Sequence, residues 1–209
     1  MSVSEDTWPE PAYVIRTERL EIRCYERGDV RALHQEVLDN IDALRPWMPW
    51  IEYEPMTLEE RGILLRTFRA RFDAGEDYVY GVFERDGTRL LGGTGLHTRA
   101  GPGALEIGYW IVSDRWGEGL ATEVAAAMTR VGFERMHAEK IEIRVSPTNQ
   151  RSLAVPRKLG YREEGTLRAA LPMRPNREAL VVFGMLSQEL PGTPAAAIDL
   201  EIEGFMNHA

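Results

Sequence analysis

The stretch from Asp114 to Thr122, Asp-Arg-Trp-Gly-Glu-Gly-Leu-Ala-Thr, has the residue types of an anion-binding turn. It follows the apolar run 107–112 and leads into an alanine-rich helical pattern. Gly117 and Gly119 allow a tight turn and a close approach of the backbone to a ligand. A helix N-terminus adds unpaired N–H groups and the positive end of the helix dipole, which attract phosphate. The sequence therefore predicts a phosphate cradle, with a plain connecting turn as the alternative.

Two common phosphate-binding motifs do not fit this loop. A P-loop requires Gly-Lys-Ser/Thr, and the stretch contains no lysine. A dinucleotide fingerprint requires glycine or alanine three residues after Gly119, where the chain has Thr122. It also requires an acidic residue at the end of the next strand, which here ends in Val145-Ser146. The cradle is therefore of another type.

Length and composition narrow the class of protein. The 209 residues suffice for one domain with a sizeable core, and 44% hydrophobic and 28% charged residues are typical of a soluble globular protein. The net charge of −8 disfavours a nucleic-acid partner. The sequence has no run that approaches a membrane span, and its acidic N-terminus is unlike a signal peptide. The single cysteine, Cys24, suits a reducing compartment, so we expect a cytoplasmic protein without membrane contact.

Hydrophobic periodicity and turn residues indicate the elements that must position the loop. Residues 1–13 have no such pattern, and we expect them to form a flexible leader. Three antiparallel strands before the loop and a strand–helix–strand unit after it predict an α/β (α+β) fold. The sheet should be mixed and mostly antiparallel, with about seven strands and helices on both faces. We expect strands at 19–25, 78–84, 89–97, 104–112, 140–146, 161–168 and 178–186, and helices at 29–40, 57–74, 119–136 and 149–160.

Two stretches depart from this regular pattern. The strand at 89–97 contains Gly92, Gly93 and Gly95, which weaken a strand unless a bulge or a close neighbour needs the space. In the C-terminal extension, 189–209, residues 198–203 alternate apolar and acidic side chains. This alternation predicts an added edge strand, and a disordered tail is the alternative.

Four short motifs, in this order and spacing, resemble those of the GCN5-related N-acetyltransferases. They are Glu106-Ile107-Gly108-Tyr109-Trp110, the loop Trp116 to Glu123, Asn149-Gln150-Arg151-Ser152 and Lys158-Leu159-Gly160-Tyr161. More narrowly, the chain resembles the RimJ/RimL-type branch, which acetylates the N-terminal amines of ribosomal proteins. The proline-punctuated loop 44–50 is also similar to that branch. The resemblance covers about residues 14–188, which we expect to form a single acetyltransferase domain.

The resemblance implies acetyl-CoA as the donor, bound where two central parallel strands, 104–112 and 140–146, splay apart. The pyrophosphate would lie on N–H groups of the glycine loop, and Asn149 would bind the pantetheine arm. Splayed strands leave backbone groups unpaired, and the amides of pantetheine can satisfy them like an added strand. The cofactor residues implied are Trp110, Ile111, Val112, Arg115, Trp116, Gly117, Gly119, Leu120, Ala121, Thr122, Asn149 and Ser152.

The chain departs from the family pattern at two positions. The family loop usually opens with Gln or Arg three residues before its first glycine, where this chain has Asp114 followed by Arg115. Many relatives carry, seven residues after the Asn, a Tyr that protonates the leaving thiolate; here that residue is Pro156. In the ribosomal-protein branch a Ser three residues after the Asn has this role, which the resemblance assigns to Ser152. Because proline removes a helix hydrogen bond, we also expect a bend or an irregular turn that leaves the Ser152 carbonyl free for water or cofactor.

An amine must lose its proton to attack a thioester, so the reaction requires a base near the splay. Glu106, inside an otherwise apolar strand, is the candidate base, acting directly or through water. The alternative is a sheet carboxylate bonded to a neighbouring side chain or amide. The four histidines have no metal-ligand spacing, so we expect no metal site.

The acceptor side has three candidate residues. Trp47 and Trp50 form either a substrate wall or anchors that hold their loop to the core. His97 either faces the acceptor cleft or is a surface histidine at the end of a strand. The sequence thus indicates an N-acetyltransferase for a primary amine, such as a protein N-terminus, acting as a monomer or homodimer. A small amine such as an antibiotic or polyamine, or a non-catalytic acyl-CoA-binding module, remain alternatives.

Overall fold

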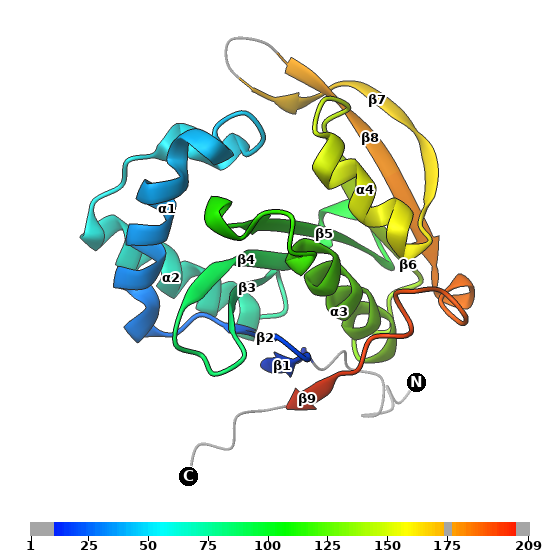
Figure 1. Ribbon diagram of the computed structural model, residues 1–209, viewed down its shortest axis with the longest axis horizontal. Helices are drawn as coiled ribbons and strands as arrows, with labels where there is room; N and C mark the ends of the chain where they lie inside the picture. Colours follow the sequence, from blue (N-terminus) through cyan, green and yellow to red (C-terminus); the bar gives the residue numbers. More distant parts are fainter. Residues whose placement is uncertain (1–10, 174–176, 204–209) are drawn as a thin grey trace, which may run out of the picture.

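The computed structural model describes residues 11–173 and 177–203, which fold around one sheet in the order β7-β8-β6-β5-β4-β3-β2-β1-β9 (Figure 1). The expected mixed, mostly antiparallel sheet is confirmed, with nine strands in place of about seven. The strands are β1 (Val14–Arg16), β2 (Leu20–Cys24), β3 (Tyr78–Glu84), β4 (Leu90–His97), β5 (Ala104–Ile111), β6 (Lys140–Val145), β7 (Arg162–Pro172), β8 (Arg177–Leu186) and β9 (Glu201–Glu203).

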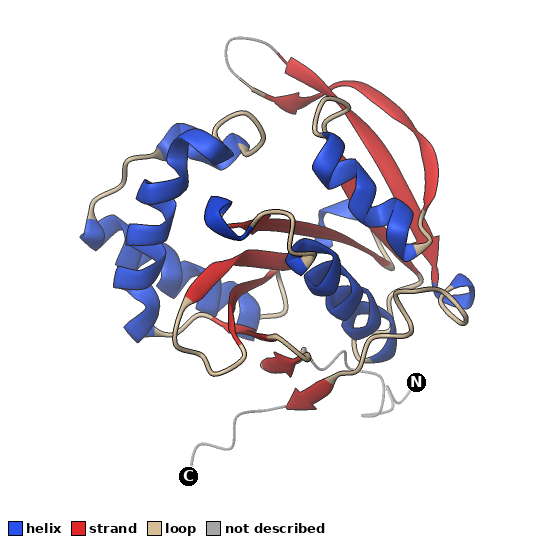
Figure 2. Ribbon diagram, viewed as in Figure 1, coloured by secondary structure: helices blue, strands red, loops and turns tan. Residues whose placement is uncertain are grey.

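Helices cover both faces of the sheet (Figure 2). The helices are α1 (Val30–Leu44), α2 (Leu58–Asp73), α3 (Leu120–Glu134) and α4 (Gln150–Leu159). The larger core lies between the sheet and α3, whose Val124, Met128 and Val131 are fully buried. A smaller core joins α1 and α2 to the other face around Leu33 and Leu65. The sheet is therefore packed on both faces, by α3 on one face and by α1 and α2 on the other.

The hairpin of β3 and β4 explains the glycines of its second strand. The pairing register shifts between Val82 and Phe83, and a Cβ on the facing Gly92 would overlap the carbonyl oxygen of Trp110. A Cβ on Gly93 would lie 2.6 Å from Nε1 of Trp110. The bulge and the close neighbour that the glycines predicted are thus both present.

β5 and β6 form the parallel pair, and they separate before either strand ends. Their register runs from Ala104 opposite Lys140 to Ile107 opposite Ile143. Beyond Ile107, β5 continues to Ile111 and β6 to Val145 without pairing to each other. The expected splay is confirmed, and it leaves backbone N–H and C=O groups of both strands facing the gap.

β1 and β9 lie together at one edge of the sheet. β9 pairs antiparallel with β1, with Ile202 opposite Ile15. The segment before β9 packs along α3, where Arg130 donates to the carbonyl of Ile198 at 2.7 Å. Tyr13, which directly precedes β1, is buried. Residues 1–10 and 204–209 lie outside the described residues, and no described helix is long and apolar enough to cross a membrane.

Candidate functional site

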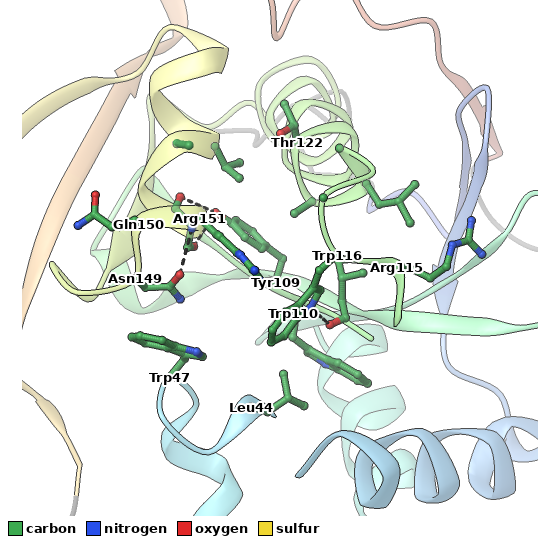
Figure 3. Close-up of a pocket in the computed structure, with 18 of the residues that line it drawn as sticks. Leu44, Trp47, Tyr109, Trp110, Arg115, Trp116, Thr122, Asn149, Gln150 and Arg151 are labelled. Atoms are coloured by element: carbon green, nitrogen blue, oxygen red, sulfur yellow. Dashed lines mark hydrogen bonds between the residues drawn. The ribbon is translucent and has the colours of Figure 1, made fainter. Parts of the chain in front are cut away.

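A cleft of about 580 Å³ opens where β5 and β6 separate. Figure 3 shows its walls: Leu44 and Trp47 come from α1 and the turn after it, and Asn149 and Arg151 from the start of α4. Of the residues predicted from sequence, those lining this cleft are Trp47, Trp110, Ile111, Arg115, Trp116, Gly117, Gly119, Leu120, Ala121, Thr122, Asn149 and Ser152. The structure thus gathers segments more than a hundred residues apart into one site.

The glycine loop forms the tight turn that its residue types predict. Gly117 and Gly119 have φ angles of 90° and 84°, which residues with a Cβ rarely adopt. α3 begins directly after Gly119, and no side chain caps its first turn. Across the described chain, the N–H groups of Leu120 and Ala121 donate no hydrogen bond. Free amides and the positive end of a helix dipole therefore face the cleft, a setting that fits a pyrophosphate.

Contacts behind the loop fix its position. Arg19 donates from Nη1 to the carbonyl of Glu118 at 2.9 Å and from Nε to Glu123 at 2.7 Å. Trp116 donates from Nε1 to the carbonyl of Ile111 at 2.7 Å. Arg115, predicted as a cofactor residue, pairs with Glu118 at 2.9 Å and with Glu84 at 2.8 Å. Its guanidinium is therefore engaged with carboxylates on the outer side of the loop.

Asn149 caps α4 from the opposite wall. Its Oδ1 accepts from the backbone N–H of Ser152 at 3.1 Å. This bond fixes the side chain at the helix N-terminus and leaves its Nδ2 without a partner among residues 11–173 and 177–203. Asn149 can therefore donate into the cleft while it stabilises α4.

Tyr109 and Ser152 meet where the strands separate. The Tyr109 hydroxyl lies 3.0 Å from Oγ of Ser152 and 3.3 Å from its carbonyl oxygen. That carbonyl lacks its usual helical donor because residue 156 is proline. α4 continues through Pro156, so the irregular turn we expected is not formed, and Tyr109 occupies the carbonyl expected to be free. Burial raises the pKa of Tyr109, which keeps its hydroxyl protonated.

Glu106 lies on the face of β5 opposite to that of Tyr109, and it does not line the cleft. Both of its oxygens accept from Arg99, at 3.0 Å from Nε and 2.6 Å from Nη2. Arg144 lies 3.5 Å from the same carboxylate. This arrangement matches the alternative interpretation, a sheet carboxylate bonded to neighbouring side chains. A catalytic role for Glu106 stays a prediction.

Three other predicted residues also lie outside the cleft lining. Trp50 packs against Trp110, with ring centroids 6.1 Å apart, and joins the smaller core. Val112 is buried, and its N–H donates to Leu91 at 2.8 Å. His97 lies on the same face as Glu106, with its Nδ1 2.8 Å from Asp77. The two tryptophans therefore occupy different places: Trp47 is a wall of the cleft, and Trp50 packs against the core.

Tyr109, Arg151 and Lys158 are among the cleft residues to which the sequence assigned no role, although they stand in the motifs of the family resemblance. Arg151 stacks over Trp116 at 5.0 Å, and neither it nor Lys158 forms an ion pair within the described ranges. Residues seven apart share one face of a helix. The spacing of Arg151 and Lys158 on a predicted helix was therefore a signal for a basic stripe beside the phosphate cradle.

Comparison with known proteins gives consistent results. The model of the acetyltransferase (GNAT) domain family matches residues 19–162. The chain is 27% identical to the putative ribosomal N-acetyltransferase YdaF of Bacillus subtilis, over 84% of this chain and 95% of the relative. It is 26% identical to the [ribosomal protein uS5]-alanine N-acetyltransferase of Escherichia coli, over 74% of this chain and 81% of the relative. The solved structure of Mycobacterium smegmatis RimJ in complex with CoA-disulfide aligns with a TM-score of 0.76 and 26% identity, covering 91% of this chain and 93% of that one.

Proposed function

The chain belongs to the GNAT acetyltransferase family and is an acetyl-CoA-dependent N-acetyltransferase, and we propose that its acceptor is the α-amine of a protein N-terminus. The acceptor is inferred from the relatives named for ribosomal proteins, which align over most of their length. One observation carries the catalytic assignment: the glycine cradle and the Ser152 hydroxyl line one cleft at the splay. A cleft with a phosphate cradle at one end and a proton donor at the other suits acyl transfer from a thioester.

We assign the cofactor site to the lining residues of this cleft. The amides of Gly117, Gly119 and Ala121 would hold the pyrophosphate, and Asn149 would donate to the pantetheine arm. The unpaired edge of β5 at Trp110 and Ile111 offers backbone groups to the pantetheine amides. Bound acetyl-CoA supplies an activated acetyl group as a thioester. Arg151 and Lys158 add positive charge to this wall.

We propose that Ser152 protonates the departing thiolate. Its Oγ lies at the apex of the splay, where the reacting end of an extended pantetheine arm would come to rest when its other end is on α3. The Tyr109 hydroxyl positions Oγ and can return a proton to it through their 3.0 Å contact. Tyr109 thus compensates from β5 for the tyrosine that Pro156 replaces on α4.

A turnover screen tests the proposed acceptor. Purified protein with acetyl-CoA is assayed against peptides with N-terminal alanine or serine, against spermidine and against an aminoglycoside. We expect turnover with an N-terminal peptide and, by mass spectrometry, acetyl on the α-amine and not on lysine. Turnover of only a small amine would overturn the proposed acceptor. Size-exclusion chromatography of the same sample tests the expected monomer or homodimer.

A further inference from the structure

The imidazole of His97 lies close to two facing glycines of the sheet. Gly95 and Gly108 are register partners on β4 and β5. A Cβ on Gly95 would lie 2.8 Å from Nε2 of His97, and a Cβ on Gly108 would lie 3.2 Å from it. A Cβ on Gly95 would therefore displace the ring, and a Cβ on Gly108 would force it to shift by a few tenths of an ångström. The backbone of two strands is thus shaped around this histidine.

Asp77 fixes the orientation of the ring. Its Oδ1 lies 2.8 Å from Nδ1 of His97, and both side chains are largely shielded, with 25% and 17% exposure. Thr98 donates to the carbonyl of Glu76 at 2.8 Å, which ties the two strand ends together beside this pair. A carboxylate at Nδ1 favours the tautomer with its proton on that nitrogen. Nε2 is then an acceptor, and it has no partner among the described residues.

Nε2 lies at the point where the parallel strands separate. Ile107 is the last residue of β5 that pairs with β6, and Gly108, under the imidazole, is the next. Tyr109 follows and places its hydroxyl at Ser152 on the opposite face of β5. Trp110, two residues beyond Gly108 on the imidazole face, lines the cleft. The histidine and the serine therefore flank the apex of the splay from opposite faces.

We propose that His97 is the general base of the reaction and that Asp77 is its positioning residue; this rests on the proposed amine acetylation. As the acceptor nitrogen bonds to the thioester carbonyl carbon, its proton passes to Nε2, directly or through one water. The C–S bond then breaks, the thiolate takes a proton from Ser152, and Ser152 regains a proton from solvent through the Tyr109 hydroxyl. The imidazolium is stabilised by the Asp77 carboxylate until it returns the proton to solvent.

The charges around His97 come from β5, from β6, from the turn before β3 and from the turn after β4. Asp77 precedes β3, Glu106 is the register partner of His97 on β5, and Arg99 follows β4. Arg144 of β6 reaches the same carboxylate. Because Arg99 binds both oxygens of Glu106, that carboxylate is neutralised. Asp77 is then the acid that acts directly on the imidazole.

The test compares His97→Gln and Asp77→Asn with the wild type, using whichever amine the screen shows to be turned over. We expect His97→Gln to lower kcat by about 10²–10⁴-fold while acetyl-CoA affinity, measured by calorimetry, is unchanged. The wild-type kcat should fall as pH decreases, because a protonated imidazole cannot accept a proton. His97→Gln should lose this acidic limb. Asp77→Asn should also lower kcat, though less than His97→Gln, because the ring keeps its base but loses the partner that orients it.

Two further variants keep the test decisive. His34→Gln, on α1, is the matched control and should retain the wild-type kcat and pH profile. Gly108→Ala should lower kcat by displacing the ring, even if His97→Gln fails to fold. An unchanged kcat and acidic limb in His97→Gln, or in Asp77→Asn and Gly108→Ala together, would overturn the proposal. Failure of N-terminal peptides as substrates would overturn only the proposed acceptor, because the assay uses the amine that is turned over.

Discussion

The donor side and the acceptor side of β5 are built in different ways. The donor side consists of the segment from Tyr109 through the glycine loop to the first turn of α3, of α4, and of the end of α1 with the turn after it. Its binding groups are mainly backbone amides at a helix N-terminus. The acceptor side consists of side chains from separate strands: His97 with Asp77, and Glu106 with Arg99. Backbone sites follow from local sequence, whereas side-chain sites depend on strand register.

The largest effect on the donor side is expected from Gly119→Glu. The new side chain would bring negative charge into the cradle at a φ of 84°, so acetyl-CoA should bind roughly 100-fold more weakly or worse. Gly119→Ala is the control, because it adds only the left-handed strain of about 1–2 kcal/mol. Calorimetry with acetyl-CoA measures both variants. Equal affinity of the wild type and Gly119→Glu would show that the phosphates lie elsewhere.

A smaller effect is expected where the two sides meet, at Tyr109 and Ser152. Ser152→Ala should lower kcat about tenfold, because water can still protonate a thiolate. Tyr109→Phe should have a similar effect, and the double variant should be little worse than either, since the two hydroxyls act as one unit. Tyr161→Phe removes another buried hydroxyl, 2.6 Å from Thr129, and controls for packing. Fully multiplicative losses in the double variant would contradict the pairing.

The same contrast explains what the sequence could and could not predict. The tight turn of the glycine loop and the start of α3 directly after it depend on neighbouring residues, and both were predicted correctly. β1 and β9 pair through three residues each, which is too short for periodicity to separate β1 from the leader. The partners of Glu106 and His97 were missed because the turns and the register of three strands decide them.

Glu106→Gln tests which residue on the acceptor side is the general base. With His97 as the base, this change should lower kcat less than tenfold and keep the acidic limb of the pH profile. It should also lower the free energy of unfolding by about 1–2 kcal/mol, because it weakens a paired, buried carboxylate. Thermal denaturation and a pH–rate profile measure both effects. If Glu106→Gln instead lowered kcat by about 10²–10⁴-fold and abolished the acidic limb of the pH profile, Glu106 would be the base.

The smallest expected effect tests whether the donor side relies on its backbone alone. Arg151 and Lys158 line the cleft, so Arg151→Gln and Lys158→Gln should each weaken acetyl-CoA binding about two- to fivefold at low salt. The loss should shrink at high salt, because exposed charges are screened within about 8–10 Å.

Arg157→Gln is the matched control on the same helix, since that guanidinium pairs with Glu163 at 3.1 Å and lies over Phe183. If the Arg157 variant weakened binding equally, the effect would reflect net charge and not the cleft. If Arg151→Gln or Lys158→Gln reduced affinity as strongly as Gly119→Glu, side chains would hold the phosphates, and the contrast between the two sides would fail.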